Sequence, residues 1–75
     1  MLETRALTFF IALADELHFG RTAERLGLAQ SALSTHILRL EDRLGTRLFA
    51  RGRRSAVQLT PAGRTFLAEA RLAVA

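Results

Sequence analysis

The sequence contains no cysteine, which excludes a disulfide framework and any metal site built on thiolates. Its two histidines, His18 and His36, lie too far apart for short-spaced ligand motifs, so neither a metal nor another cofactor is expected. No apolar run reaches the length of a membrane span, because the mostly apolar residues 6–14 end at Asp15 and Glu16. The N-terminus also lacks the basic, apolar and cleavage-site order of a signal peptide. We therefore expect a protein of the reducing cytoplasm that has no membrane partner.

Lysine is absent as well: all eleven basic residues are arginine, whose planar guanidinium suits phosphate better than an ammonium group does. The net charge is +4 over 75 residues, a length that fits one small domain. This charge is concentrated, since the segment between Asp42 and Glu69 holds no acid and six arginines, at positions 43, 47, 51, 53, 54 and 64. The segment favours a polyanionic partner, with a solvated cationic surface as the alternative.

Residues 21–44 form the pattern around which the chain is organised: a short helical segment, a glycine and a longer helical segment. Ala23 is small where two crossing helices approach, and Gly27 can take the positive φ that ends the first helix. The second helix is expected to begin near residues 29–31 and to stop at Gly45. Its apolar residues recur at helical spacing and are predicted to be buried together: Leu33, Ile37, Leu40 and Leu44. The pattern indicates a helix-turn-helix, in which the first helix supports the second against a duplex.

The outward face of the longer helix carries the candidate base-reading residues, which are Gln30, Ser31, Ser34, Thr35 and Leu38. Small hydroxyls and an amide let a helix enter the major groove while they offer donors and acceptors to base edges. Asp42 lies on the same face and would repel DNA. The reading end is therefore expected at residues 30–35.

A first helix is expected over residues 4–17, with Thr4 as its N-cap and an apolar surface wide enough for the core or for a second, intermolecular contact. Five of its residues fall on one apolar stripe: Leu7, Phe10, Ile11, Ala14 and Leu17. Residues 18–20 then break the pattern: we interpret His18 as a turn residue and Gly20 as the N-cap of a helix over residues 21–26. Free amides in the first turn of that helix can bind a phosphate, helped by the side chains of Arg21 and Thr22. A merely capped helix start is the alternative.

After Gly45 the apolar residues no longer recur at helical spacing. Residues 48–50 and 56–59 are short β-prone runs that predict a hairpin. An isolated hairpin is unstable, so three of its residues are expected to pack on the helices: Phe49, Val57 and Leu59. The tip then projects outward. Beside a helix-turn-helix such a hairpin is a wing, whose arginines meet phosphates or the minor groove: Arg51, Arg53 and Arg54.

A last helix is predicted after Thr60 as N-cap and Pro61 as the first helical residue. Its apolar residues cover more than one face: Phe66, Leu67, Ala70, Leu72, Ala73 and Val74. Such a helix needs two partners, one of them the domain itself and the other a second subunit or a following domain. The candidate contacts with a second subunit are Phe66, Leu67, Ala70, Leu72 and Val74. The chain also stops within this pattern, so we expect it to be the front piece of a longer protein.

The runs 10–14, 19–26, 30–34, 37–41, 44–45, 48–49 and 59–63, together with Arg51, resemble the N-terminal DNA-binding domain of LysR-type bacterial transcriptional regulators. The resemblance covers nearly the whole chain. It implies a mainly α fold with a small β-hairpin, a winged helix-turn-helix over residues 1–60, and a truncated linker helix over residues 61–75 that pairs with a second subunit. It also implies a small-molecule effector, bound by a C-terminal domain that is absent here. Such regulators bind inverted repeats in double-stranded DNA as dimers or tetramers, and they are not enzymes.

The resemblance assigns base reading to Gln30, Ser31, Ser34 and Thr35, and the wing to Arg51, Arg53 and Arg54. The chain departs from the family at several positions. Ala29 stands where the family often has a serine cap, a loss of about 1 kcal/mol of helix stability. Ser31 replaces a frequent proline, Thr35 and His36 replace arginine and glutamine, and Leu38 replaces a basic or polar residue. Thr35 and Leu38 could instead contact a thymine methyl group.

Protein interaction and hydrolysis are the alternative functions. A winged helix can be a protein-interaction module without DNA binding, and the apolar excess of the first and last helices would serve that purpose. Hydrolase chemistry finds no support, because His36 would point away from Ser34 on a helix and no oxyanion loop is evident. The arginine-tipped hairpin beside a small polar helix face favours sequence-specific binding to double-stranded DNA by a homodimer.

Overall fold

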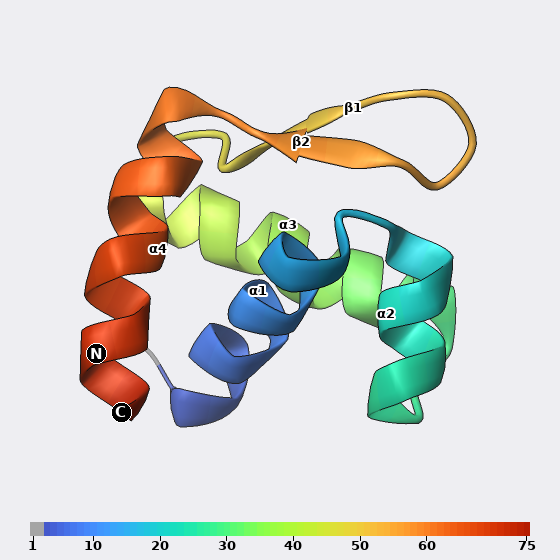
Figure 1. Ribbon diagram of the computed structural model, residues 1–75, viewed down its shortest axis with the longest axis horizontal. Helices are drawn as coiled ribbons and strands as arrows, with labels where there is room; N and C mark the ends of the chain where they lie inside the picture. The colour runs from blue at the N-terminus through green and yellow to red at the C-terminus, as the bar shows by residue number, and fades with distance from the viewer. Residues whose placement is uncertain (1–2) are drawn as a thin grey trace.

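In the computed structural model, which describes residues 3–75, the chain forms four helices and a two-stranded antiparallel hairpin (Figure 1). The elements follow in the order α1 (Thr4–Glu16), α2 (Phe19–Leu26), α3 (Gln30–Leu44), β1 (Phe49–Arg51), β2 (Val57–Leu59) and α4 (Pro61–Val74). The predicted fold class, mainly α with a small hairpin, is confirmed. Within the part of the chain that the structure describes, no helix is both long enough and apolar enough to cross a bilayer.

The centre of the core is built on α1. Phe10 and Leu13 are fully buried, and the Phe10 ring lies 5.4 Å from the ring of Phe49 in β1 and 5.1 Å from that of Phe66 in α4. One aromatic side chain of α1 therefore connects the hairpin and the last helix. The apolar face of α3 completes the core with three of its predicted members, Leu33, Ile37 and Leu40.

The turn between α2 and α3 has the geometry that the glycine predicts. Gly27 has φ 69°, in the left-handed region, and the Leu28 amide then donates to the Ala23 carbonyl at 2.9 Å. Ala23 is 3% exposed where α2 meets α3, and Leu28 packs against the core. The predicted helix-turn-helix is confirmed.

Three predictions about helix ends and burial are wrong. Helix α1 covers nearly the expected residues, but its N-cap is Glu3 in place of Thr4. Leu17 is the left-handed C-cap, with φ 55°, and it is 38% exposed because it no longer follows the helical spacing of the stripe on which it was predicted to lie. Leu44 is the last residue of α3, directly before the αL residue Gly45, and it is 37% exposed. At this end of the helix the core no longer covers the whole apolar face of α3.

The hairpin pairs Phe49 with Leu59, Ala50 with Gln58 and Arg51 with Val57. Phe49 and Val57 are buried and Leu59 packs against the core, so the predicted packing of the hairpin on the helices is confirmed. Figure 1 shows the hairpin lying across the helical layer, from the start of α4 towards α2.

Helix α4 begins as predicted, with Thr60 as N-cap and Pro61 as the first helical residue. The Thr60 hydroxyl accepts from the Gly63 amide at 2.9 Å and donates to the Arg47 carbonyl at 2.7 Å. Gly63 is buried against Leu48, and a Cβ atom at this position would overlap the Leu48 carbonyl oxygen. The absence of a side chain at Gly63 therefore sets how closely α4 approaches the segment that leads into β1.

Candidate nucleic-acid interface

The outward face of α3 is exposed at four of its five predicted reading residues: Gln30, Ser31, Thr35 and Leu38. Ser34 is half-buried. The Thr35 hydroxyl donates to the Ser31 carbonyl at 3.0 Å, so its oxygen keeps lone pairs for an incoming donor. Leu38 is 42% exposed, an unusual place for a leucine on a polar helix face. This face is narrow, and small side chains dominate its N-terminal half.

The hairpin is attached to the segment between α1 and α2 by main-chain hydrogen bonds. The Phe19 amide donates to the Ser55 carbonyl at 2.8 Å, and the Val57 amide donates to the Leu17 carbonyl at 3.1 Å. An isolated antiparallel bridge between His18 and Ala56 lies between these bonds. The hairpin is therefore held beside the start of α2, close to the N-terminal end of α3.

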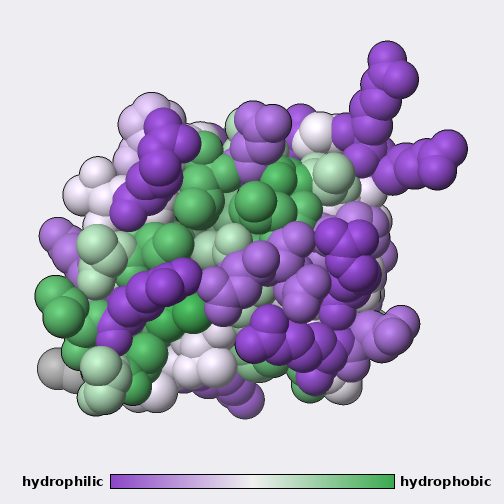
Figure 2. Space-filling model, viewed as in Figure 1, coloured by the Kyte–Doolittle hydropathy of each residue, from purple (hydrophilic) through white to green (hydrophobic). Residues whose placement is uncertain are grey.

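The three predicted wing arginines are all exposed, but they differ in their contacts. The Arg51 guanidinium lies over the Phe19 ring, 4.4 Å from its centroid, so it is held against the domain by a cation–π contact. Arg53 and Arg54 belong to the turn, where the Gly52 amide donates to the Ala56 carbonyl at 2.9 Å and Arg54 has φ 56°. Figure 2 shows hydrophilic side chains projecting beyond the rest of the surface at the end of the molecule where Figure 1 places this turn.

A side-chain hydrogen bond links the reading helix to the hairpin. Gln30 Nε2, at the start of α3, donates to Ser55 Oγ at 3.0 Å. The two residues are 25 positions apart in the chain. Sequence reasoning placed Gln30 on the reading face but gave Ser55 no role, since nothing local in the sequence pairs them.

The start of α2 differs from its prediction. The N-cap is His18, not Gly20, because the helix begins at Phe19 and His18 Nδ1 accepts from the Arg21 amide at 3.0 Å. Thr22 is fully buried and its hydroxyl donates to the His18 carbonyl at 2.7 Å, so its side chain cannot contact a phosphate. The amides of Phe19, Arg21 and Thr22 already have partners within the domain. Of the two side chains predicted to contact a phosphate, only that of Arg21 is exposed, and it forms a 3.5 Å ion pair with Glu16.

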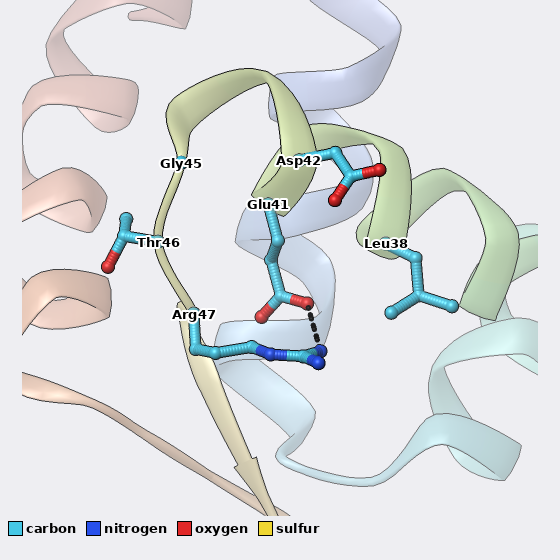
Figure 3. A pocket seen from close by; sticks show the side chains of 6 residues that line it. All are labelled: Leu38, Glu41, Asp42, Gly45, Thr46 and Arg47. Carbon is cyan, nitrogen blue, oxygen red and sulfur yellow. Dashed lines mark hydrogen bonds and ion pairs between the residues drawn. The ribbon is translucent and has the colours of Figure 1, made fainter.

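Glu41 has a role that the sequence did not reveal. Its carboxylate is 5% exposed and accepts from the Leu48 amide at 2.8 Å and the Phe49 amide at 3.2 Å. An ion pair with Arg47 at 3.5 Å lies at the edge of a cavity of about 420 Å³ between α3 and the following loop (Figure 3). Only the fold brings backbone donors to this buried carboxylate, because Leu48 and Phe49 lie beyond the end of α3.

The predicted subunit contacts on α4 are divided by burial. Ala70 is 1% exposed and belongs to the core, so its assignment to a contact with a second subunit is wrong. Phe66 and Leu67 are partly buried against the core. Leu72 is 80% exposed and Val74 37% exposed, and they turn away from the domain. Figure 2 shows hydrophobic surface gathered on the side of the molecule that holds α4 and α1.

Comparison with known proteins gives this geometry a context. Residues 4–64 match the model of the bacterial regulatory helix-turn-helix proteins of the lysR family. The transcriptional regulator ShiR of Corynebacterium glutamicum is 57% identical over 74 residues, which are 99% of this chain and 25% of ShiR. The regulator YnfL of Escherichia coli, itself uncharacterised, is 53% identical over 70 residues, which are 93% of this chain and 23% of YnfL. The chain thus spans about a quarter of the length of these curated relatives.

Two solved structures match almost the whole chain. The DNA-binding domain of CbnR in complex with DNA superposes with a TM-score of 0.92 at 34% identity, covering 97% of this chain and 83% of that one. The DNA-binding domain of BenM in complex with benA site 1 DNA gives a TM-score of 0.89 at 37% identity, covering 97% and 84%. The sequence match, the hairpin beside the exposed helix face and these superpositions agree, and the chain belongs to the LysR family of bacterial regulatory helix-turn-helix proteins.

Proposed function

We propose that this chain is the DNA-binding domain of a transcriptional regulator, with α3 in the major groove of double-stranded DNA and the hairpin turn on phosphates or in the minor groove. The observation that carries the proposal is the placement of the exposed polar start of α3 beside the arginine-bearing hairpin, joined by the bond from Gln30 to Ser55. A helix end with an amide and hydroxyls suits base edges. A cationic loop next to it suits the adjacent backbone.

The surroundings of each side chain support different roles. Gln30, Ser31, Thr35 and Leu38 are exposed on α3 and are proposed to contact base edges, with half-buried Ser34 at the margin of that surface. Arg53 and Arg54 extend from the turn and are proposed to contact phosphates, as is Arg21 at the start of α2. Arg51 lies against Phe19 and would add its charge at the base of the wing. That CbnR and BenM domains of this shape have been solved in complex with DNA supports DNA as the partner.

The remainder of the regulator is also a proposal. Residues 1–60 would be the DNA-binding module and residues 61–75 the start of a linker helix, which pairs two subunits through outward side chains such as Leu72 and Val74. A homodimer of this kind would bind a site with dyad symmetry. A small-molecule effector would bind a further domain, consistent with the chain's spanning only about a quarter of its curated relatives.

Selection of duplexes from a random pool by the 75-residue chain tests this function. We expect enrichment of one sequence, with two half-sites related by a dyad, and an affinity that falls steeply as salt rises because arginine contacts release counterions from phosphates. If the chain binds no duplex, or if its affinity for duplexes does not depend on ionic strength, the result contradicts the proposal and favours a protein-interaction module. Equal enrichment of all sequences would contradict base reading by α3 while leaving backbone contacts in place.

A further inference from the structure

The side-chain amide of Gln30 lies where three elements meet. Its Nε2 atom donates to Ser55 Oγ of the hairpin at 3.0 Å. On its other side, a Cβ atom added to Gly20 would lie 3.5 Å from Gln30 Oε1, so the start of α2 borders the amide without a side chain. The amide is exposed to solvent yet has protein on two sides. Its position is therefore more restricted than that of an ordinary surface glutamine.

Ser55 has a fixed position from which to hold this amide. Its carbonyl oxygen accepts from the Phe19 amide at 2.8 Å, and the next residue, Ala56, forms the bridge with His18. Two residues further on, the Val57 amide donates to the Leu17 carbonyl at 3.1 Å. The main chain on this side of the turn is therefore bonded to residues 17–19, which places the Ser55 hydroxyl beside the start of α2.

The polarity of the surroundings matches the orientation of the amide. Oε1 of Gln30 lies near Gly20 in the first turn of α2, the positively polarised end of that helix, while Nε2 donates to a hydroxyl oxygen. A glutamine amide has two N–H donors and a carbonyl oxygen with two lone pairs. After the bond to Ser55, one N–H and the oxygen remain available. These are the two groups that together recognise the N7 and N6 atoms of adenine in the major groove.

We propose, on the basis of the function proposed above, that Ser55 is a positioning residue that presents the Gln30 amide to adenine before DNA binds. A free glutamine loses side-chain entropy when it forms a bidentate contact, and an amide that is already held loses less. Ser55 thereby makes the wing contribute to base preference without touching a base. Loss of the hydroxyl is expected to lower the preference for adenine roughly threefold to tenfold, the fold-change that corresponds to one net hydrogen bond.

Four variants of the 75-residue chain test the inference: Ser55→Ala, Ser55→Thr, Gln30→Ala and the double variant Gln30→Ala with Ser55→Ala. Each is used to select duplexes from a random pool, and its affinity is then measured for the parent's selected duplex and for a scrambled duplex of the same composition. We expect Gln30→Ala to abolish an adenine preference at one base pair of each half-site. Ser55→Ala should weaken the same preference, Ser55→Thr should retain it, and both Ser55 variants should bind the scrambled duplex as the parent does.

The double variant separates positioning from other effects. If Ser55 acts through Gln30, removing its hydroxyl has no further effect on base preference once the Gln30 side chain is gone. Three results would overturn the inference: an unchanged adenine preference in Ser55→Ala, an equal loss of affinity for both duplexes, or a further loss of preference in the double variant. In each of these cases a parent that still selects one site leaves the proposed function intact. A parent that selects no site removes both proposals together.

Discussion

The Glu41 carboxylate accepts a hydrogen bond from the Leu48 amide at 2.8 Å, across the turn that joins α3 to the hairpin. The same oxygen accepts from the Phe49 amide at 3.2 Å, and the carboxylate is 5% exposed. Two backbone donors at the entry to β1 therefore depend on one side chain of α3. Through Glu41 the helix determines where the hairpin begins, as Ser55 and Gln30 relate the two elements at the opposite end.

Replacing Glu41 by glutamine should lower the free energy of unfolding by roughly 1.5–3 kcal/mol, since a charged acceptor is lost and an NH₂ group is placed among buried donors. Urea unfolding followed by circular dichroism measures the change. The neighbouring substitution Asp42→Asn removes an exposed acid from the same helix and should change stability by less than about 0.5 kcal/mol. Equal stabilities of the two variants would contradict the role given to Glu41.

Replacing Gly63 by alanine distinguishes close packing from helix propensity. Propensity alone would make this substitution in α4 stabilising by about 1 kcal/mol. The added methyl group would overlap the Leu48 carbonyl oxygen, so we expect destabilisation of about 2 kcal/mol or more. Thermal unfolding gives the sign directly. A higher melting temperature than the parent's would show that α4 does not approach Leu48 as closely as described.

His18 should stabilise α2 through its cap. Replacing it by alanine leaves the Arg21 amide without its side-chain acceptor and should cost about 1 kcal/mol of stability. Asparagine is a strong N-cap residue, so His18→Asn should keep most of the parent stability. Chemical denaturation of the three proteins measures both effects. If the alanine and asparagine variants are equally destabilised, the loss arises from the ring and not from the cap.

The arginines of the hairpin should separate into two kinds. Arg53→Ala should weaken binding to every duplex alike and make the plot of log affinity against log salt shallower by about 0.9, the value for one phosphate contact. The thermal stability of Arg53→Ala should equal that of the parent. Arg51→Ala should in addition lower stability by about 0.5–1 kcal/mol, because the contact with the Phe19 ring is lost. A loss confined to one sequence in Arg53→Ala would assign that residue to base reading.

Leu72 tests the proposed pairing of subunits through α4. The parent chain should sediment as a dimer at micromolar concentration, and Leu72→Glu should sediment as a monomer because a charge is buried at the interface. Since Leu72 is 80% exposed in the single domain, the substitution should leave thermal stability of the monomer unchanged. Leu38→Glu, a matched change on α3, should remain dimeric. A monomeric parent would exclude pairing through this stretch alone.

Most of the fold could be predicted because its signals are local. Gly27 and Gly45 end helices in the left-handed region, Thr60 and Pro61 begin one, and the periodic leucines of α3 identify its buried face. The misplaced cap of α2 arises where a tertiary contact replaces a local rule. Gly20 is an acceptable cap in isolation, but α2 begins at Phe19, whose amide donates to the Ser55 carbonyl, and His18 is the N-cap.

The residues of the candidate interface could be named from the sequence, but most contacts that join them to the rest of the domain could not. Gln30 and the hairpin arginines follow from helical spacing and from charge. The burial of Thr22 and Ala70, and the contacts made by Ser55 and Glu41, depend on which segments meet in space. Nothing in the sequence around Ser55 identifies Gln30, 25 residues away, as the hydrogen-bond partner of its hydroxyl. Such pairings become visible only after the elements have been placed.

The main-chain bonds that join Leu17 and Phe19 to the hairpin have a consequence for the duplex itself. They tie the hairpin to the start of α2, and so restrict the distance between the hairpin turn and the exposed face of α3. If α3 enters the major groove and the turn contacts the flanking backbone, as proposed, adjustment between the two partners would fall to the DNA, whose groove width and bendability vary with sequence. Bases that neither α3 nor the hairpin touches would thereby influence affinity through the mechanical compliance of the site.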